Sequence, residues 1–159
     1  GEKLIILGVD PGIATVGYGM VEYSGNRFLS SDHGAILTPA RTDLEDRLNS
    51  IYDELCRLIV YYKAENMAVE ELFFNTNVKT AIHVAHGRGV ILLAGKKMGV
   101  PTFEYTPLQV KQAVVGYGRA EKQQVMAMVR MLLNLQKTPR PDDAADALAL
   151  AICHAHTIR

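Results

Sequence analysis

The sequence predicts an α/β fold in which helices flank a five-stranded mixed sheet. Residues 4–9, 15–23 and 27–37 are strand-like segments joined by short turns, which predicts an antiparallel meander. Residues 67–70 and 101–105 are also strand-like, but each follows a long helical pattern. Because a strand reached through a helix normally lies parallel to its neighbour, we expect these two strands as parallel additions to the meander.

Local patterns justify the elements in turn. Residues 4–9 form an apolar run that leads into Asp10-Pro11-Gly12, as expected for a buried strand that ends in a tight turn. The stretch from Thr42 to Glu45 has the pattern of a capping box, and the apolar positions after it recur every three or four residues to Tyr62. Further helices are expected at residues 77–98, 107–116, 120–133 and 142–156, with Asn77 and Thr106 as N-caps and residues 73–77 as a loop.

The composition is that of an ordinary globular protein. The chain has 159 residues, of which 48% are hydrophobic and 21% charged, so we expect one compact domain over residues 1–159 and exclude disordered or collagen-like classes. No apolar stretch approaches the roughly 20 residues of a membrane helix, and the first residues do not resemble a secretory signal. The two cysteines, Cys56 and Cys153, form no disulfide pattern, which favours a cytoplasmic protein.

The charges are unevenly distributed along a chain whose formal net charge is zero. Residues 43–72 contain eight acids and three bases, whereas residues 75–130 contain eight bases and two acids. Such a distribution is compatible with a basic face that binds nucleic acid, and also with charges scattered over solvated helices. The charge pattern alone leaves both interpretations open.

Four acids occupy positions where a carboxylate is costly. Asp10 and Glu70 end two strands that are expected to be buried, and Asp143 and Asp146 share one face of the last helix. That helix is otherwise rich in alanine and leucine, so we expect it to pack against the sheet. Isolated carboxylates in apolar surroundings are unfavourable unless they are paired or bind a metal.

Together the four acids predict a site for hard divalent cations such as Mg²⁺ or Mn²⁺, which prefer oxygen ligands. Two ions held by carboxylates are suited to in-line displacement at phosphorus. A structural alternative treats Asp10 as a turn residue and Asp143 as an acid favoured by the helix dipole. That alternative gives no role to Glu70 or Asp146, so the set of four favours the metal site.

Several segments resemble the motifs of the RuvC family of Holliday-junction resolvases, the crossover junction endodeoxyribonucleases of the ribonuclease-H-like superfamily. They follow one another along essentially the whole chain. The segments are LGVDPG at 7–12, GYG at 17–19, AVEELF at 68–73, VKQ at 110–112, VVG at 114–116, AEK at 120–122 and DAADALA at 143–149.

This resemblance implies a ribonuclease-H-like fold, a homodimer, and Mg²⁺-dependent cleavage of two opposed strands of a four-way DNA junction in homologous recombination and DNA repair. It implies two Mg²⁺ ions per subunit, with Mn²⁺ able to substitute, and a RuvA–RuvB branch-migration complex as a partner. The catalytic and metal-binding acids that it implies are Asp10, Glu70, Asp143 and Asp146. It assigns DNA binding to Lys111, Lys122 and Phe73.

The sequence leaves more than one interpretation open for several residues. Either Phe73 or Phe74 is a candidate platform for an unpaired base, while the other is expected in the core. The apolar helix at residues 77–98, with small residues at Ala81, Ala85 and Gly89, is expected either near a dimer axis or against the sheet. Arg88, between two glycines, is expected at a helix, dimer or DNA contact.

Three other functions compete with junction resolution. A ribonuclease-H-type nuclease that cuts RNA–DNA hybrids would share the fold and the metals. A catalytically silent junction-binding relative would be expected to lack one or more of the four acids. A kinase of the actin-like type is excluded, because such enzymes need a second nucleotide-binding domain and a second Asp-x-Gly turn.

Overall fold

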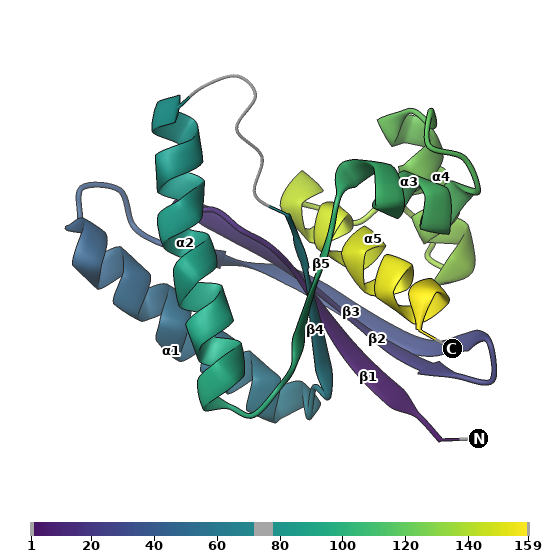
Figure 1. Ribbon diagram of the computed structural model, residues 1–159, viewed down its shortest axis with the longest axis horizontal. Coiled ribbons are helices and arrows are strands. Elements are labelled where there is room, and N and C mark those ends of the chain that lie inside the picture. Colours follow the sequence, from purple (N-terminus) through teal and green to yellow (C-terminus); the bar gives the residue numbers. More distant parts are fainter. Residues whose placement is uncertain (1, 72–77, 159) are drawn as a thin grey trace.

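The structure, a computed structural model, describes residues 2–71 and 78–158 and contains a five-stranded mixed sheet in the order β3-β2-β1-β4-β5 (Figure 1). The antiparallel part consists of β1 (Leu4–Asp10), β2 (Thr15–Ser24) and β3 (Arg27–Leu37). The parallel additions are β4 (Asn66–Glu70) beside β1 and β5 (Thr102–Tyr105) beside β4. The predicted meander and both parallel strands are confirmed. Phe73, Phe74 and Asn77 lie outside the described residues, and so does the loop expected at 73–77.

Helices cover both faces of the sheet. One face carries α1 (Leu44–Tyr62) and α2 (Val78–Lys97), and the other carries α3 (Pro107–Val115), α4 (Lys122–Leu132) and α5 (Asp142–Thr157), as Figure 1 shows. Two separate hydrophobic clusters result. Leu7, Val9 and Met67 pack toward α1 and α2, whereas Ile6, Val21 and Ala68 pack toward α5. This division follows from the alternation of side chains along each strand.

The start of α1 differs from the predicted capping box. The N-cap is Asp43, whose side chain makes no capping hydrogen bond, and the Thr42 hydroxyl instead donates to the carbonyl oxygen of Pro39 at 2.7 Å. The prediction was wrong because a Thr hydroxyl can bond to the preceding turn as readily as to the helix end. At α3 the predicted N-cap Thr106 is confirmed, and it forms a capping box with Gln109.

Among the described residues, no helix is long and apolar enough to cross a membrane.

The feature that positions the site is the close packing of α5 on β1 and β2. An added Cβ at Gly8 would overlap the carbonyl oxygen of Ala147, and one at Gly17 would overlap the carbonyl of Asp143. A Cβ at Gly19 would come 2.6 Å from Cγ of Leu148. The glycines of these two strands therefore leave room for the α5 backbone directly above the sheet. We call the surface formed by Gly8, Gly17 and Gly19 the glycine seat of α5.

Replacing a glycine of this seat should displace α5. In Gly17→Ala the new methyl group meets backbone atoms, which cannot rotate aside, so the first turn of α5 must shift or the strand must distort. We expect destabilisation of roughly 1–3 kcal/mol in chemical denaturation. Gly25→Ala, in the β2–β3 turn, is the comparison: no atom lies within 4 Å of its added Cβ, and its strain comes from the positive φ of 57° alone. A Gly17→Ala protein as stable as wild type would contradict this packing.

Candidate active site

Two acids reach the site from the ends of neighbouring parallel strands. Asp10 and Glu70 are the last residues of β1 and β4, whose preceding residues Val9 and Val69 are paired in the sheet. Because Val9 and Val69 pack toward α1 and α2, the next residue in each strand points to the opposite face. Asp10 and Glu70 therefore face α5.

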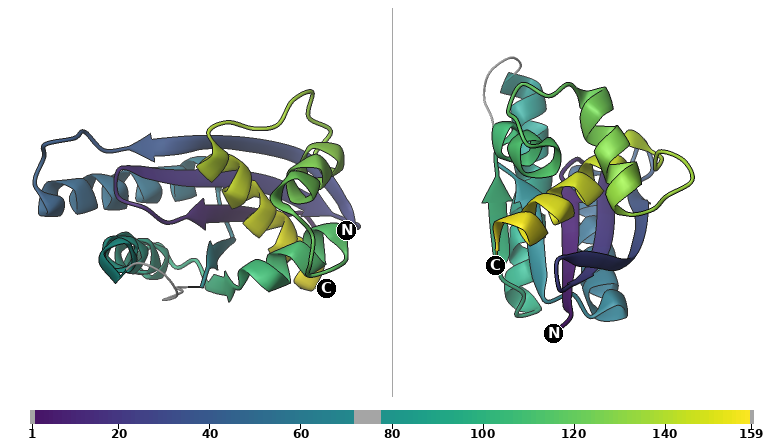
Figure 2. Two further views of the ribbon diagram at one scale, coloured as in Figure 1. Left: turned by 90° about the horizontal axis from the view of Figure 1, so that it is seen from above. Right: turned by 90° about the vertical axis from the view of Figure 1, so that its right-hand side faces the viewer.

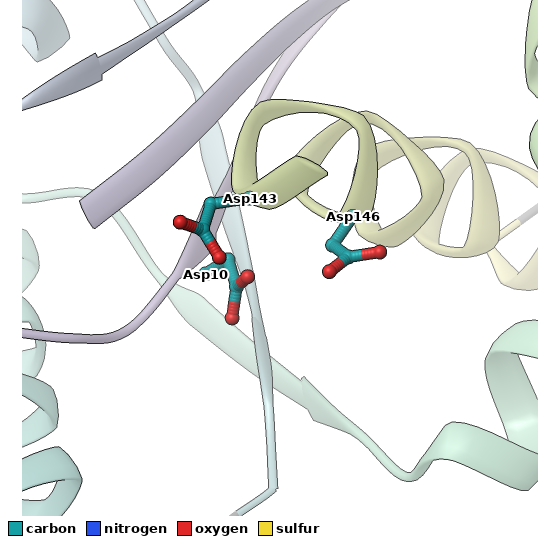
Figure 3. A group of neighbouring side chains, drawn as sticks. All are labelled: Asp10, Asp143 and Asp146. Carbon is teal, nitrogen blue, oxygen red and sulfur yellow. The ribbon is translucent and has the colours of Figure 1, made fainter. Parts of the chain in front are cut away.

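The other two acids come from the first two turns of α5. Asp143 and Asp146 lie three residues apart, on one face of the helix. The glycine seat holds that part of α5 against the end of β1, where Gly17 pairs with Asp10. Oxygen atoms of Asp10, Asp143 and Asp146 consequently lie within 4.8 Å of one another (Figure 3). The structure thus brings together three of the four predicted acids as one cluster, which we call the acid cluster.

Glu70 lies beside this cluster and is not one of its three members. Its negative charge still acts on Asp10, and it lines the same cleft as Asp146. The backbone carbonyl of Glu70 accepts a hydrogen bond from Nε of Arg88 at 3.3 Å. Three of the four predicted carboxylates therefore meet within this spacing, and Glu70 lines the same cleft as Asp146.

The electrostatics of the cluster show that its negative charge is poorly compensated. Burial, followed by the charges of Asp146, Asp143 and Glu70, raises the pKa of Asp10 to about 8. Burial also raises the pKa of Glu70, with a further contribution from Asp146. At Asp146 burial again raises the pKa, although the nearby Lys122 opposes the shift. Carboxylates crowded in this way favour a bound cation or a proton.

A cleft next to the acid cluster contains both predicted lysines. It has a volume of about 270 Å³ and is bounded by α3, α4, α5 and the end of β4, with Glu70, Lys111, Lys122 and Asp146 among its lining residues. Nζ of Lys122 lies 3.5 Å from a carboxylate oxygen of Asp146. Lys111 is half-buried in the cleft wall. The sequence could not indicate the contact between Lys122 and Asp146, since the two residues are 24 positions apart.

Arg88 makes its described contacts within the chain. Its guanidinium lies 2.5 Å from a carboxylate oxygen of Glu104 and also bonds the Glu70 backbone. Its side chain is largely buried, so α2 is tied to the ends of β4 and β5 beside the site. Of the interpretations left open by the sequence, the structure supports a contact within the protein.

The donor set fits a hard divalent cation. The acid cluster supplies only carboxylate oxygens, the ligands that Mg²⁺ and Mn²⁺ prefer. Among the described residues, the acid cluster is the only group of three or more acids, histidines or cysteines within this spacing. His154 is not a ligand candidate, because it is buried and its ring nitrogens bond Tyr105 and Asn66.

Comparison with known proteins places these features in a family. A family model described as crossover junction endodeoxyribonuclease RuvC matches residues 6–154. Crossover junction endodeoxyribonuclease RuvC of Alkaliphilus oremlandii is 60% identical over 154 residues, covering 97% of this chain and 94% of that protein. The protein of the same name from Clostridioides difficile is 56% identical over 154 residues, covering 97% of this chain and 91% of that protein.

Solved structures of known resolvases have the same fold as this chain. The structure of Thermus thermophilus RuvC in complex with a Holliday junction substrate is 36% identical, with a TM-score of 0.91 over 98% of this chain and 95% of that chain. The yeast mitochondrial Holliday junction resolvase Ydc2 is 10% identical, with a TM-score of 0.62 over 95% of this chain and 77% of that chain, which shows a shared fold. The expected ribonuclease-H-like fold is confirmed. The chain belongs to the RuvC family of crossover junction endodeoxyribonucleases.

Proposed function

We propose that this chain resolves Holliday junctions by hydrolysing one phosphodiester bond in each of two opposed strands, in homologous recombination and DNA repair. The observation that carries the proposal is the convergence of Asp10, Asp143 and Asp146 at the end of β1, in a member of this nuclease family. The Thermus thermophilus relative is in complex with a Holliday junction substrate, which supports the same substrate for this chain.

The acid cluster and Glu70 would hold two Mg²⁺ ions, for which Mn²⁺ would substitute. Bound ions of this kind activate water and stabilise the leaving oxygen at phosphorus. The charges of Asp143, Asp146 and Glu70 all act on Asp10, so these four side chains together would hold the ions. The glycine seat fixes the helix that carries Asp143 and Asp146, so little rearrangement is needed when DNA arrives.

The cleft lysines would allow a polyanion to approach these acids. Lys122, next to Asp146, and Lys111, which lines the same cleft, would contact phosphates near the scissile bond. Phe73 follows closely after Glu70 in the chain and would insert at the junction centre. A DNA substrate and two free cysteines are consistent with a cytoplasmic location.

Cutting two equivalent strands requires two active sites, and we propose that a homodimer supplies them. An exposed apolar stripe of α2 is the candidate interface. It comprises Val78, Ile82, Gly89 and Leu93, which recur on one side of the helix. Ala81, expected in this contact, is buried within the chain and does not contribute. A RuvA–RuvB complex is a further proposed partner, which rests on the family resemblance.

The alternative functions are less well supported. All four acids are present, which disfavours a silent relative. A nuclease acting on RNA–DNA hybrids would share the acid cluster, so a direct comparison of substrates is needed to separate it from a resolvase.

Neutralising any of the acids should abolish cleavage while leaving junction binding intact. We expect Asp10→Asn, Glu70→Gln and Asp146→Asn each to cut at least about 100-fold more slowly, because each removes a ligand of a bound ion. Binding should persist, since removing negative charge does not weaken the attraction of phosphates. The assay offers a four-way junction, a duplex and an RNA–DNA hybrid, with Mg²⁺ or with EDTA.

Asp142→Asn is the matched control, because Asp142 is exposed in the first turn of α5 and lies outside the acid cluster. It should cut the junction at the wild-type rate. Wild-type rates in any of the three other variants would refute the assignment of that acid. Preference for the hybrid over the junction would refute the resolvase.

Charges placed on the α2 stripe should separate the subunits. Ile82→Glu combined with Leu93→Glu should sediment as a monomer where the wild type sediments as a dimer, because both exposed side chains would be desolvated at the interface. This variant should leave single nicks in a junction extruded from a supercoiled plasmid. Met131→Glu, at a still more exposed apolar position on α4, should remain dimeric. A dimeric double variant would show that the subunits associate elsewhere.

A further inference from the structure

A second basic pocket lies on the far side of α5 from the cleft lysines. It has a volume of about 730 Å³ and is formed by β3, the end of α4 and the connection from α4 to α5. Three of its seven lining residues are cations and none is an acid. The lining residues are His33, Arg130, Gln136, Lys137, Thr138, Pro139 and Arg140.

The three cations have no ion pair with any carboxylate in the part of the chain that the structure describes. Arg130 holds the connection in place, because its Nε donates to the carbonyl oxygen of Leu135 at 3.3 Å. Pro139 is buried beneath the pocket, whereas Lys137 and Arg140 are exposed at its rim. Because the backbone of this connection is anchored, it does not have to be ordered when the two exposed, uncompensated cations bind an anion.

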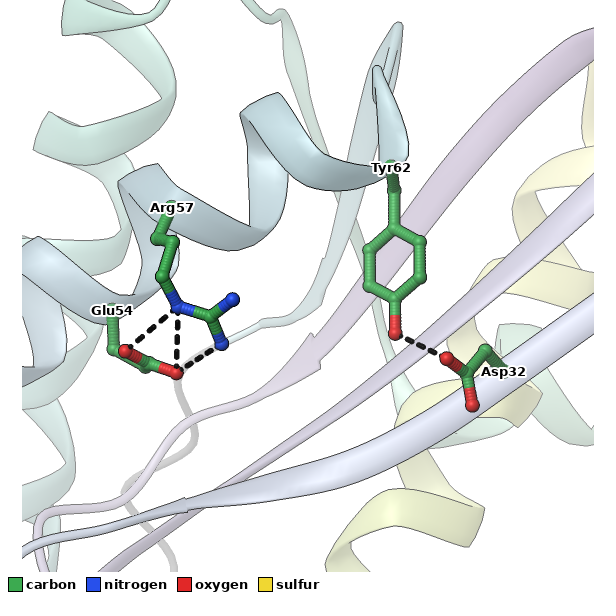
Figure 4. A network of polar contacts seen from close by, with 4 residues as sticks. All are labelled: Asp32, Glu54, Arg57 and Tyr62. Carbon is green, nitrogen blue, oxygen red and sulfur yellow. Dashed lines mark hydrogen bonds and ion pairs between the residues drawn. The ribbon is translucent and has the colours of Figure 1, made fainter.

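Asp32, the acid next to His33 on β3, does not neutralise the charge of this pocket. His33 pairs with Gly19, which faces α5, so the His33 side chain points to the α5 face. Asp32 therefore points to the opposite face, where its carboxylate accepts a hydrogen bond from the hydroxyl of Tyr62 on α1 at 2.6 Å (Figure 4). The strand thus separates Asp32 from the cations across the sheet.

The pocket adjoins the acid cluster along the chain. Arg140 precedes Asp143 by three residues, so their Cα atoms are at most about 11 Å apart. The connection from α4 to the start of α5 can be followed by its colour in Figure 2, and its residues Lys137 and Arg140 share the pocket with His33 of β3. Since successive phosphates of one strand advance about 3.4 Å along a duplex, a strand at the acid cluster would pass the pocket within a few nucleotides.

We propose that Lys137 and Arg140 bind backbone phosphates of a junction arm on the β3 side of the active site, roughly two to five nucleotides from the scissile phosphate. An Arg guanidinium can bind a phosphate through two parallel hydrogen bonds, and the Lys ammonium adds a point charge. Together with Lys111 and Lys122, cations then flank the acid cluster on both sides of α5. This inference rests on the proposed function and extends it to a second contact with the same DNA.

The salt dependence of junction binding tests the inference. In EDTA, where no strand is cut, the wild type is compared with Lys137→Ala/Arg140→Ala. The slope of log K against log salt should become shallower by about two, since each lost phosphate contact accounts for about 0.9. The affinity ratio of the two proteins should therefore change by roughly 12- to 16-fold between 50 and 200 mM salt.

Further variants calibrate this result. Lys96→Ala/Lys97→Ala removes two exposed cations at the end of α2, at the opposite edge of the sheet, and should keep the wild-type slope. Lys111→Ala should lower the slope by about one, as expected for a single contact in the cleft. Lys137→Gln/Arg140→Gln repeats the test with longer side chains if the alanine variant unfolds. The single variant Arg140→Lys keeps the positive charge and should therefore keep the wild-type slope, although it loses the bidentate contact.

Single methylphosphonate linkages, which are uncharged, locate the contact. In wild type, neutral linkages beside the pocket should weaken binding, and in the double variant they should have no further effect. If the wild type binds and cuts junctions but the double variant has the same slope and the same linkage map, the inference is overturned. If the wild type fails to bind or cut junctions at all, it is the proposed function that fails.

Discussion

The packing of α5 on the glycine seat is the contact on which the rest of the site depends. Without side chains at Gly8, Gly17 and Gly19, the helix lies directly on β1 and β2. The buried residues of α5 that face the strands include small alanines, such as Ala144 and Ala147, which also allow the helix backbone to come close to the sheet. A strand end and a helix start are thereby held at a separation that side chains of ordinary size would prevent. The acid cluster is the chemical consequence.

This packing has an electrostatic cost, and the distribution of charge offsets it. The pKa of Asp10 is raised because burial and three neighbouring acids disfavour its charged form. Lys122 lowers the cost at Asp146, and a bound divalent cation would lower it for the whole cluster. The overall neutrality of the chain conceals this arrangement, because acids also lie elsewhere, four of them on α1 on the opposite face of the sheet.

Much of the fold was predictable from the sequence, because strands, turns and helices are set by local patterns. The meander of the first three strands and the two parallel additions followed from these patterns, whereas the order of the strands and the shared face of Asp10 and Glu70 came from the structure. The acids of α5 were recognisable because Asp143 and Asp146 interrupt an otherwise apolar helix.

Contacts between distant segments were not predictable in this way. Arg88 pairs with Glu104, and Lys122 with Asp146, across separations that no local pattern records. The position of Glu70 outside the acid cluster depends on side-chain geometry at the end of β4. The basic pocket was missed because its residues come from β3, α4 and a connection, and each alone resembles a solvated surface residue.

The most direct test of convergence at the acid cluster is the thermal stability of metal-free protein against pH. Because the pKa of Asp10 is higher in the folded than in the unfolded chain, the folded state binds more protons, and stability should fall as pH rises from about 4 to about 8. Asp10→Asn should be more stable than wild type at the alkaline end, and its stability should depend less on pH. Added Mg²⁺ should raise the thermal stability of the wild type at alkaline pH and have little effect on that of Asp10→Asn. Identical pH profiles for both proteins, with no effect of Mg²⁺, would contradict the account.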